Sequence, residues 1–254
     1  RWMAALSYQE YCAGLQPLTQ GVSRRVPCPN GKWRVGLMSC DFHVHATSML
    51  IAEFLEGIDQ ERFELYFYSG GPDDQSDLRA RIRRTATCWV ETADLSSAQL
   101  AERIRDDEIG VLLEMKGYTL GTRMDVLAYR PAPIQISWLG YPGSTGASSL
   151  DYIIGDPVVT PLDAQPHYSE CIAQMPCCYQ PNDSTRARPA AVSREQCGLP
   201  EEATFVFASF NMSYKIVPEV FDAWCCILEA TPGSVLWLLV KYAPARQRLR
   251  EAAC

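Results

Sequence analysis

The sequence lacks the features that mark nucleic-acid binders and membrane-spanning proteins. Its 23 lysines and arginines are outnumbered by 30 acidic residues, and the formal net charge of -7 argues against the basic patch of a nucleic-acid-binding protein. No apolar run reaches the roughly 20 residues that a spanning helix needs, and the first thirty residues do not resemble a secretory signal peptide. We therefore expect neither a nucleic-acid partner nor a membrane span.

The sequence also lacks a cysteine framework, although it contains 11 cysteines. None of them forms a CxxC motif or a cluster with histidine. An odd number without zinc-binding spacing favours free thiols over disulfides or a metal site, and free thiols persist in reducing compartments. We therefore interpret the cysteines as small core residues and predict a cytoplasmic location, extended to the nucleus if the source is eukaryotic.

From residue 33 onward the chain alternates short apolar strands with amphipathic helices. Strands are predicted at 34–39, 63–68, 87–90, 110–114 and 134–138, helices at 47–56, 97–106 and 123–128, and a loop followed by a helix at 72–84. Strands and helices that alternate at this spacing predict a parallel, doubly wound α/β sheet. Residues 1–32 have no clear strand pattern, and we interpret them as a helix remnant and a linker that follow a preceding region.

The alternation stops and then resumes in the last third of the chain. Residues 157–200 are rich in proline and polar residues and are predicted to form a long connection. Strands at 204–208 and 234–240 and helices at 218–230 and 244–253 follow, which are too few to complete a typical open sheet. The helix at 218–230 is expected to bury an apolar face at helical spacing, formed by Val220, Phe221, Trp224, Ile227 and Leu228. We therefore expect a complete Rossmann-like lobe with its connecting segment at 33–200 and the beginning of a second, truncated lobe at 201–254.

Ligands of open parallel sheets bind beyond the carboxyl ends of the strands, where the first unusual loop is 39–47. It places His43 and His45 between a strand and a helix N-terminus. A histidine there transfers protons near neutral pH, and the helix end favours a negative group. The alternative is a surface histidine without a role.

Two further loops follow strands in the same way. The segments 114–123 and 139–146 contain several glycines, which allow a close backbone approach to a ligand but are equally typical of tight turns. Lys215 precedes a predicted helix, where the positive end of the helix dipole disfavours a cation. An anionic diphosphate would remove that conflict, whereas the alternative is a solvated lysine that points away.

Taken together, these segments closely resemble the catalytic region of the protein O-GlcNAc transferase family. The resemblance extends over roughly residues 33–242, in the family's order. The residues that carry it are 39–47, 117–119, 130–135, 138–146, 151–152, 168–170, 210–211, 214–216 and 234–239.

The resemblance implies a GT-B type glycosyltransferase with two Rossmann-like lobes. Members of the family are inverting enzymes that work without a metal or a further cofactor. They transfer N-acetylglucosamine from the donor UDP-GlcNAc to serine or threonine hydroxyls of polypeptide acceptors. They usually carry tetratricopeptide repeats before the catalytic region, so residues 1–32 would join such repeats to the first lobe.

The resemblance also assigns roles to single residues by position. His45 matches an active-site histidine once proposed as the base, and Lys215 matches the lysine that meets the diphosphate and stabilises the leaving group. These two are the expected catalytic residues. The expected substrate-binding residues are Tyr118 near the acceptor and sugar, the turn residues Leu139, Gly140 and Pro142 against the sugar, and Asn211 and Tyr214.

The sequence departs from the family in three places. Met212 stands where animal members have glutamine and many bacterial members have asparagine, and Glu114 and Lys116 change the loop before Tyr118. The family's later histidine-threonine-threonine segment, which accompanies the residues that hold uridine, has no counterpart. We therefore predict that this chain alone is inactive.

Two alternatives to an O-GlcNAc transferase fragment stay open. One is a SPINDLY-like protein O-fucosyltransferase that uses GDP-fucose, because the pocket that selects the base lies mostly outside this sequence. The other is a non-catalytic remnant that binds a protein partner through an exposed cleft face, with apolar surface from Val235, Leu236 and Leu238.

Overall fold

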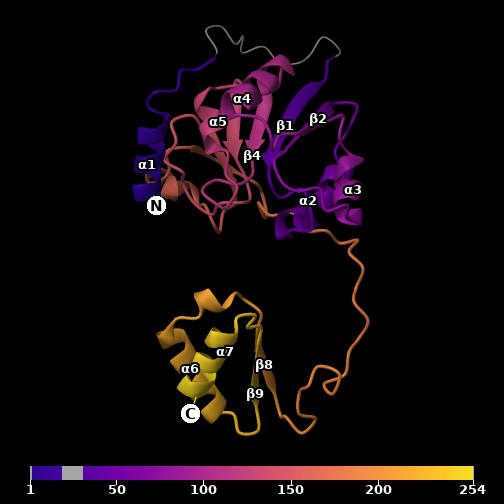
Figure 1. Cartoon of the computed structure of the whole chain (residues 1–254), viewed down its shortest axis with the longest axis vertical. Helices are drawn as coiled ribbons and strands as arrows, with labels where there is room; N and C mark the ends of the chain where they lie inside the picture. The colour runs from indigo at the N-terminus through magenta and orange to yellow at the C-terminus, as the bar shows by residue number, and fades with distance from the viewer. Residues whose placement is uncertain (1, 19–30, 254) are drawn as a thin grey trace. The chain divides into compact units, whose positions relative to one another are not determined.

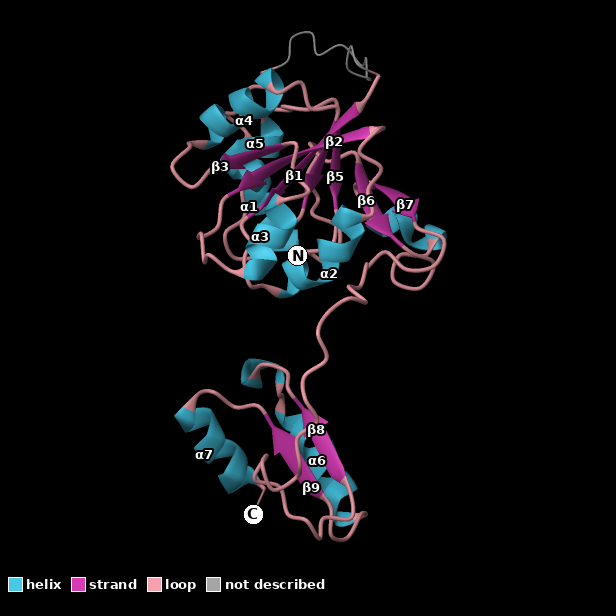
Figure 2. Ribbon diagram, turned by 90° about the vertical axis from the view of Figure 1, so that its right-hand side faces the viewer, coloured by secondary structure: helices cyan, strands magenta, loops and turns pink. Residues whose placement is uncertain are grey.

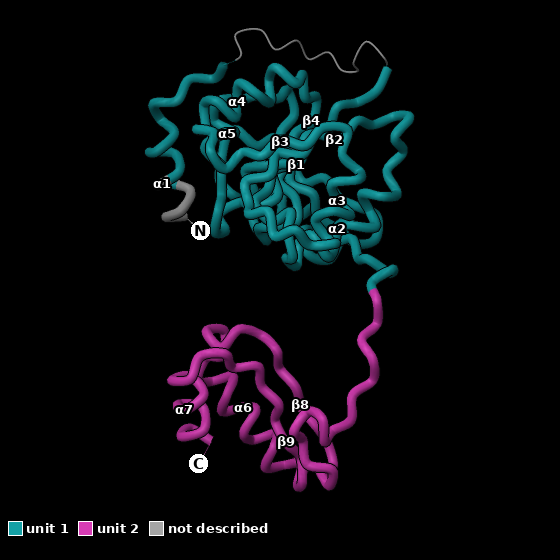
Figure 3. Tube along the Cα trace, turned by 45° about the vertical axis from the view of Figure 1, so that its right-hand side comes forward, with its two compact units in different colours: residues 1–186 teal, residues 187–254 magenta. Residues whose placement is uncertain are grey.

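A computed structural model of the chain describes residues 2–18 and 31–253. They form two compact units that divide between Arg186 and Ala187, shown in different colours in Figure 3. The segment 187–200, predicted as the connection at the end of the first lobe, is thus grouped with the second unit. Among the described residues, no helix combines the length and the apolar character that crossing a bilayer requires.

The first unit consists of short strands and helices in strict alternation over most of its length. Its elements are α1 (Trp2–Cys12), β1 (Trp33–Ser39), α2 (Ala46–Glu56), β2 (Phe63–Ser69), α3 (Asp77–Arg83), β3 (Cys88–Glu91), α4 (Ser97–Asp106), β4 (Val111–Glu114), α5 (Met124–Ala128), β5 (Ile134–Ser137), β6 (Tyr152–Gly155), the 3₁₀ helix η1 (Leu162–His167) and β7 (Cys171–Gln174).

The strands of the first unit form one parallel sheet, seven-stranded within the described residues, in the order β3-β2-β1-β4-β5-β6-β7 (Figure 2). Val35 of β1 lies opposite Leu65 of β2 on one side and Val111 of β4 on the other. The chain builds outward from β1 to β3 and then crosses to the other side of β1 with β4. This reversal places a crevice at the carboxyl ends of β1 and β4, the usual ligand position in such folds.

Helices cover both faces of this sheet, as the prediction of a doubly wound fold requires (Figure 1). α2 and α3 pack on one face through Ile51, Leu55 and Ile82, and α4 and α5 on the other. Because both faces are buried, the strands are nearly continuous apolar runs. The predicted α4 begins and ends as expected, and Ser96 and Gln99 form its capping box.

Three short elements in the first unit are not predicted from the sequence. η1 and β7 lie inside the segment predicted as a long connection, and β6 precedes it. β6 and β7 have four residues each, and they pair in register from Tyr152 opposite Cys171 to Gly155 opposite Gln174. Segments this short take their conformation from the neighbouring strand, so their own sequence pattern is weak.

The interpretation of the cysteines as core residues is wrong for those that the structure describes. All nine are free, and none is buried: Cys171, Cys177, Cys178 and Cys226 are exposed, and the others are partly exposed. Most of them lie at strand ends, in loops or on the outer side of a helix. In these positions neighbouring elements do not close over a small side chain.

The second unit is smaller and is described by itself. It comprises β8 (Val206–Ser209), the 3₁₀ helix η2 (Ser213–Lys215), α6 (Pro218–Glu229), β9 (Val235–Leu238) and α7 (Ala243–Ala252). β8 and β9 pair in parallel, with Val206 opposite Val235. The expectation that α6 buries a full apolar face is wrong: Phe221 is buried, whereas Val220 and Ile227 are exposed, because two strands offer little surface to cover a helix.

Candidate functional site

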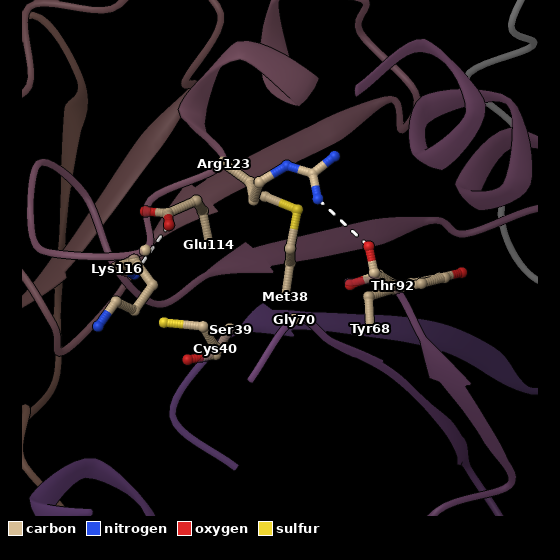
Figure 4. A pocket seen from close by; sticks show the side chains of 10 residues that line it. Met38, Ser39, Cys40, Tyr68, Gly70, Thr92, Glu114, Lys116 and Arg123 are labelled. Carbon is tan, nitrogen blue, oxygen red and sulfur yellow. Dashed lines mark hydrogen bonds between the residues drawn. The ribbon is translucent and has the colours of Figure 1, made fainter. Parts of the chain in front are cut away.

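The loops after β1 and β4 meet at the crevice where the strand order reverses. Figure 4 shows that Glu114, Lys116 and Arg123 come from the β4 side, and Ser39 and Cys40 from the β1 side. The cavity between them measures about 10 Å³, which is room for about one water molecule. Side chains therefore fill the crevice, and a ligand would bind above it.

A buried ion pair joins the two loops across the crevice. Lys116 Nζ donates to both carboxylate oxygens of Asp41, at 2.9 and 2.7 Å. The two side chains are 8% and 7% exposed, so the pair is almost completely removed from water. Breaking such a pair from one side leaves an uncompensated buried charge, so each residue holds the other loop in place.

Glu114 fixes the backbone turn that carries Lys116. Its carboxyl group accepts hydrogen bonds from the backbone amides of Lys116 at 2.8 Å and Gly117 at 2.7 Å. Burial raises the pKa of Glu114 to about 7, against the lowering effect of these two amides. Gly117 has a φ of +50°, and a Cβ there would collide with Tyr141, so only glycine fits.

His45 is the N-cap residue of α2, which fixes the direction of its ring. The backbone amide of Thr47 donates to His45 Nδ1 at 3.2 Å, and Asp41 Oδ2 lies 3.4 Å from the same nitrogen. Burial lowers the pKa of His45, as do the neighbouring Lys116 and His43, while Asp41 raises it. The ring is therefore neutral near pH 7 and sits beside the Asp41–Lys116 ion pair.

The predicted sugar-facing turn rests directly on the loop after β4. Leu139 has a φ of +73°, and a Cβ on Gly140 would collide with the backbone carbonyl of Met115. Tyr118 donates its hydroxyl to the carbonyl of Thr145 at 2.7 Å, which fastens the far end of the turn to the same loop. The structure thus brings Tyr118, Leu139 and Gly140 together, and their contact with a substrate stays a prediction.

Pro142 borders a recess beside this turn. The recess has a volume of about 90 Å³, and its lining includes the side chains of Tyr141, Tyr168 and Tyr179. Trp138 Nε1 donates to the carbonyl of Tyr179 at 3.0 Å, which holds one wall against β5. The recess is large enough for a small group such as an acetamide or a hydroxymethyl.

Glu170 holds the 139–146 turn in place through its carboxylate, although the sequence alone assigned it no role. It is fully buried and accepts hydrogen bonds from the Thr145 amide at 2.8 Å, the Ser144 hydroxyl at 2.7 Å and the Ser169 hydroxyl at 3.0 Å. A buried carboxylate with this many donors is paired for a structural purpose. The matched segment 168–170 contains it, but nothing local indicates its partners.

The remaining predicted residues belong to the second unit. Asn211 is exposed in the loop after β8, and Tyr214 is exposed in η2. Lys215 ends η2 three residues before α6 begins at Pro218. Lys215 thus precedes the N-terminus of a twelve-residue helix, as predicted. Because each unit is described by itself, a joint role of Lys215 and His45 stays a prediction.

The strand order, the crevice at the switch point and the glycine-dependent turn above it define a Rossmann-like α/β protein. The chain belongs to glycosyl transferase family 41, whose model matches residues 16–189 and 182–253. The predicted family is thereby confirmed.

The names of two plant relatives agree with this assignment. The chain is 36% identical over 248 residues to the Arabidopsis thaliana protein named probable UDP-N-acetylglucosamine–peptide N-acetylglucosaminyltransferase SEC, covering 94% of this chain and 25% of the relative. It is 32% identical over 218 residues to a rice protein with the same enzyme name and the designation SPINDLY, covering 83% and 22%.

A solved structure is similar over almost the whole chain. A mutant O-GlcNAc transferase of Thermobaculum terrenum has a TM-score of 0.84 and 27% identity, covering 99% of this chain and 47% of the solved one. The match confirms the predicted α/β fold of the GT-B type. The chain spans about a quarter of the length of the two plant relatives and about half of this solved chain.

Proposed function

We propose that this chain is a catalytic part of an inverting protein O-GlcNAc transferase. The parent activity is transfer of N-acetylglucosamine from UDP-GlcNAc to serine or threonine hydroxyls of polypeptides. The observation that carries the proposal is the crevice of the first unit. There His45, Tyr118 and the turn of Leu139 and Gly140 come together in a chain that is 36% identical to a protein named as such a transferase.

In this proposal the first unit supplies neutral polar groups. His45 is uncharged near neutral pH and stands at the N-terminus of α2, so it can hydrogen-bond a hydroxyl without adding charge. The turn presents backbone rather than side chains, which suits close contact with a sugar ring. Pro142 and its tyrosine-lined recess offer a place for a small substituent of that ring.

The second unit supplies positive charge for the departing nucleotide. Lys215 carries an ammonium group just before the N-terminus of α6, where the helix dipole also favours an anion. A leaving diphosphate could be neutralised by these two features without a metal ion. No metal or cofactor forms part of the proposal.

Calorimetric titration of UDP and UDP-GlcNAc into the purified chain tests the nucleotide site. Binding that is lost in Lys215→Ala and kept in Lys241→Ala, an exposed lysine of the same unit, supports the proposal. No binding by a folded sample would contradict a nucleotide site on this chain. Because the chain matches 47% of the solved transferase, we expect no detectable transfer to a peptide by the chain alone.

The alternatives give different results in the same experiment. Tighter binding of GDP-fucose than of UDP-GlcNAc would favour the SPINDLY-like O-fucosyltransferase. No nucleotide binding, together with stable association with a partner protein, would favour the non-catalytic remnant. The relatives designated SPINDLY are also named as N-acetylglucosaminyltransferases and are less similar than SEC, so the GlcNAc donor stays the leading proposal. The cytoplasmic location stays a prediction.

A further inference from the structure

The contacts of His45 Nδ1 contain a conflict that only one protonation state resolves. The Thr47 amide donates to Nδ1 at 3.2 Å, so this nitrogen must offer a lone pair. Asp41 Oδ2 lies 3.4 Å from Nδ1 and would need a proton on the same nitrogen. A neutral imidazole carries its proton on one nitrogen alone, so the two contacts cannot both be hydrogen bonds.

Lys116 supplies the hydrogen bonds that Asp41 would otherwise need from a proton on His45 Nδ1. Its ammonium group donates to both oxygens of the Asp41 carboxylate, at 2.9 and 2.7 Å, in a nearly water-free setting. The Asp41 charge is therefore satisfied without a proton from the ring. Some histidines pair with a buried carboxylate that has no other charged partner. There the proton stays on Nδ1 and is donated in a hydrogen bond to the carboxylate, which leaves Nε2 unprotonated and able to act as a base.

We propose that Lys116 is a positioning residue that acts through Asp41 to hold His45 in the form protonated at Nε2. In this form the ring donates a hydrogen bond from Nε2 and cannot accept a proton there while it is neutral. The consequence for the reaction rests on the proposed function: His45 would orient an oxygen atom of the donor or acceptor through Nε2–H and would not itself accept the hydroxyl proton at Nε2.

The charged and titratable neighbours agree with this reading. Asp41 and His43 belong to the same loop as His45, and Lys116 comes from the loop after β4. Asp74, from the loop before α3, accepts a hydrogen bond from the Val44 amide at 2.7 Å and faces His43. Burial lowers the pKa of His45, and Lys116 and His43 lower it further against the raising effect of Asp41, so the ring is neutral near pH 7.

Nitrogen-detected NMR of the histidine side chains tests this proposal on the intact chain without substrate. The chain has three histidines, so loss of signals in His45→Asn assigns the ring of interest. We expect the pattern of a neutral imidazole protonated at Nε2 in the wild type. In Lys116→Met we expect the proton to move to Nδ1, hydrogen-bonded to Asp41, with a pKa of His45 above its wild-type value.

Two further variants separate the ion pair from general damage. Asp41→Asn/Lys116→Met removes both charges of the ion pair and leaves no carboxylate beside Nδ1, so His45 should keep its proton on Nε2. Lys241→Met removes an exposed lysine and should change nothing. A wild-type ring protonated at Nδ1 overturns the proposal whether or not Lys116→Met folds, and so does an unchanged ring in folded Lys116→Met.

This experiment is independent of the proposed function. The protonation pattern can be as expected in a chain that binds no nucleotide, and calorimetry can succeed in a chain whose His45 is protonated at Nδ1. A chain with the expected protonation pattern but no nucleotide binding would refute the transferase proposal and leave the role of Lys116 standing. A chain that binds nucleotide but has His45 protonated at Nδ1 would refute the role of Lys116 and leave the transferase proposal standing.

Discussion

The two units of this chain share the same alternation of strand and helix, but their apolar side chains are buried to very different degrees. In the first unit, helices close both faces of a broad sheet, and Leu100, Ala101 and Ile104 of α4 are completely buried. In the described part of the second unit, Ala203 and Phe221 are the buried apolar residues. Preorganised geometry therefore belongs to the first unit, whose polar site residues are held by a packed core.

The largest expected difference between the units concerns apolar packing. Leu100→Ala should lower the free energy of unfolding of the first unit by about 2–5 kcal/mol, because it leaves a cavity in a closed core. Ile227→Ala, at a helix position 46% exposed in the second unit, should change stability by less than about 0.5 kcal/mol. Amide hydrogen exchange under denaturant measures the free energy of unfolding of each unit. Equal decreases in the two variants would contradict the proposed difference in packing between the units.

A smaller effect is expected for the buried anchor of the turn. Glu170→Ala should cost about 1–3 kcal/mol, since the Thr145 amide and three hydroxyls lose their acceptor. The matched control is Glu195→Ala, an exposed glutamate of the second unit, for which no measurable change is expected. Faster hydrogen exchange confined to 140–146 would show that the loss is local, and unchanged exchange there would contradict the anchoring role.

The smallest effect concerns the last residues of the first unit. Asp183 accepts hydrogen bonds from Arg81, which holds its pKa at about 2, below the usual value. A depressed folded-state pKa stabilises the protein above the unfolded value of 3.8, and this stability is lost as the pH falls from there through 2. We expect a loss on the order of 1 kcal/mol after solvent screening.

Acid titration of stability in Asp183→Asn measures this contribution. The variant should be less stable than the wild type at neutral pH, and the difference should shrink as the pH approaches 2. Glu195→Gln serves as the exposed control. A difference that is constant between pH 6 and pH 2 would show that the ion pair with Arg81 contributes no pH-dependent stability.

The sequence predicts the fold where the pattern is local. The limits of α4 follow from Ser96, Gln99 and the apolar spacing behind them, and the structure confirms them. β6 and β7 are missed because strands of only four residues owe their extended form to pairing with a neighbour. The buried face predicted for α6 is overstated because helical spacing shows which residues share a face but not how much surface lies opposite them.

The same distinction applies to the site. His45, Tyr118 and Gly140 could be located because they lie in long segments that resemble a known family. Thr145, which Glu170 holds, lies 25 residues away in sequence, and Lys116 meets Asp41 across 75 residues. Such pairs leave no periodic pattern, so only the folded arrangement shows which charge satisfies which.

The contact of Gly140 with the Met115 carbonyl has a consequence for how a sugar would be bound. The turn packs directly against the loop after β4 and cannot move closer to it, and Tyr118 and Glu170 hold its other end. Its conformational entropy is therefore lost when the chain folds, long before any ligand arrives. A ligand that fits would bind without ordering this backbone, whereas a ligand of the wrong shape would meet a surface that does not adapt.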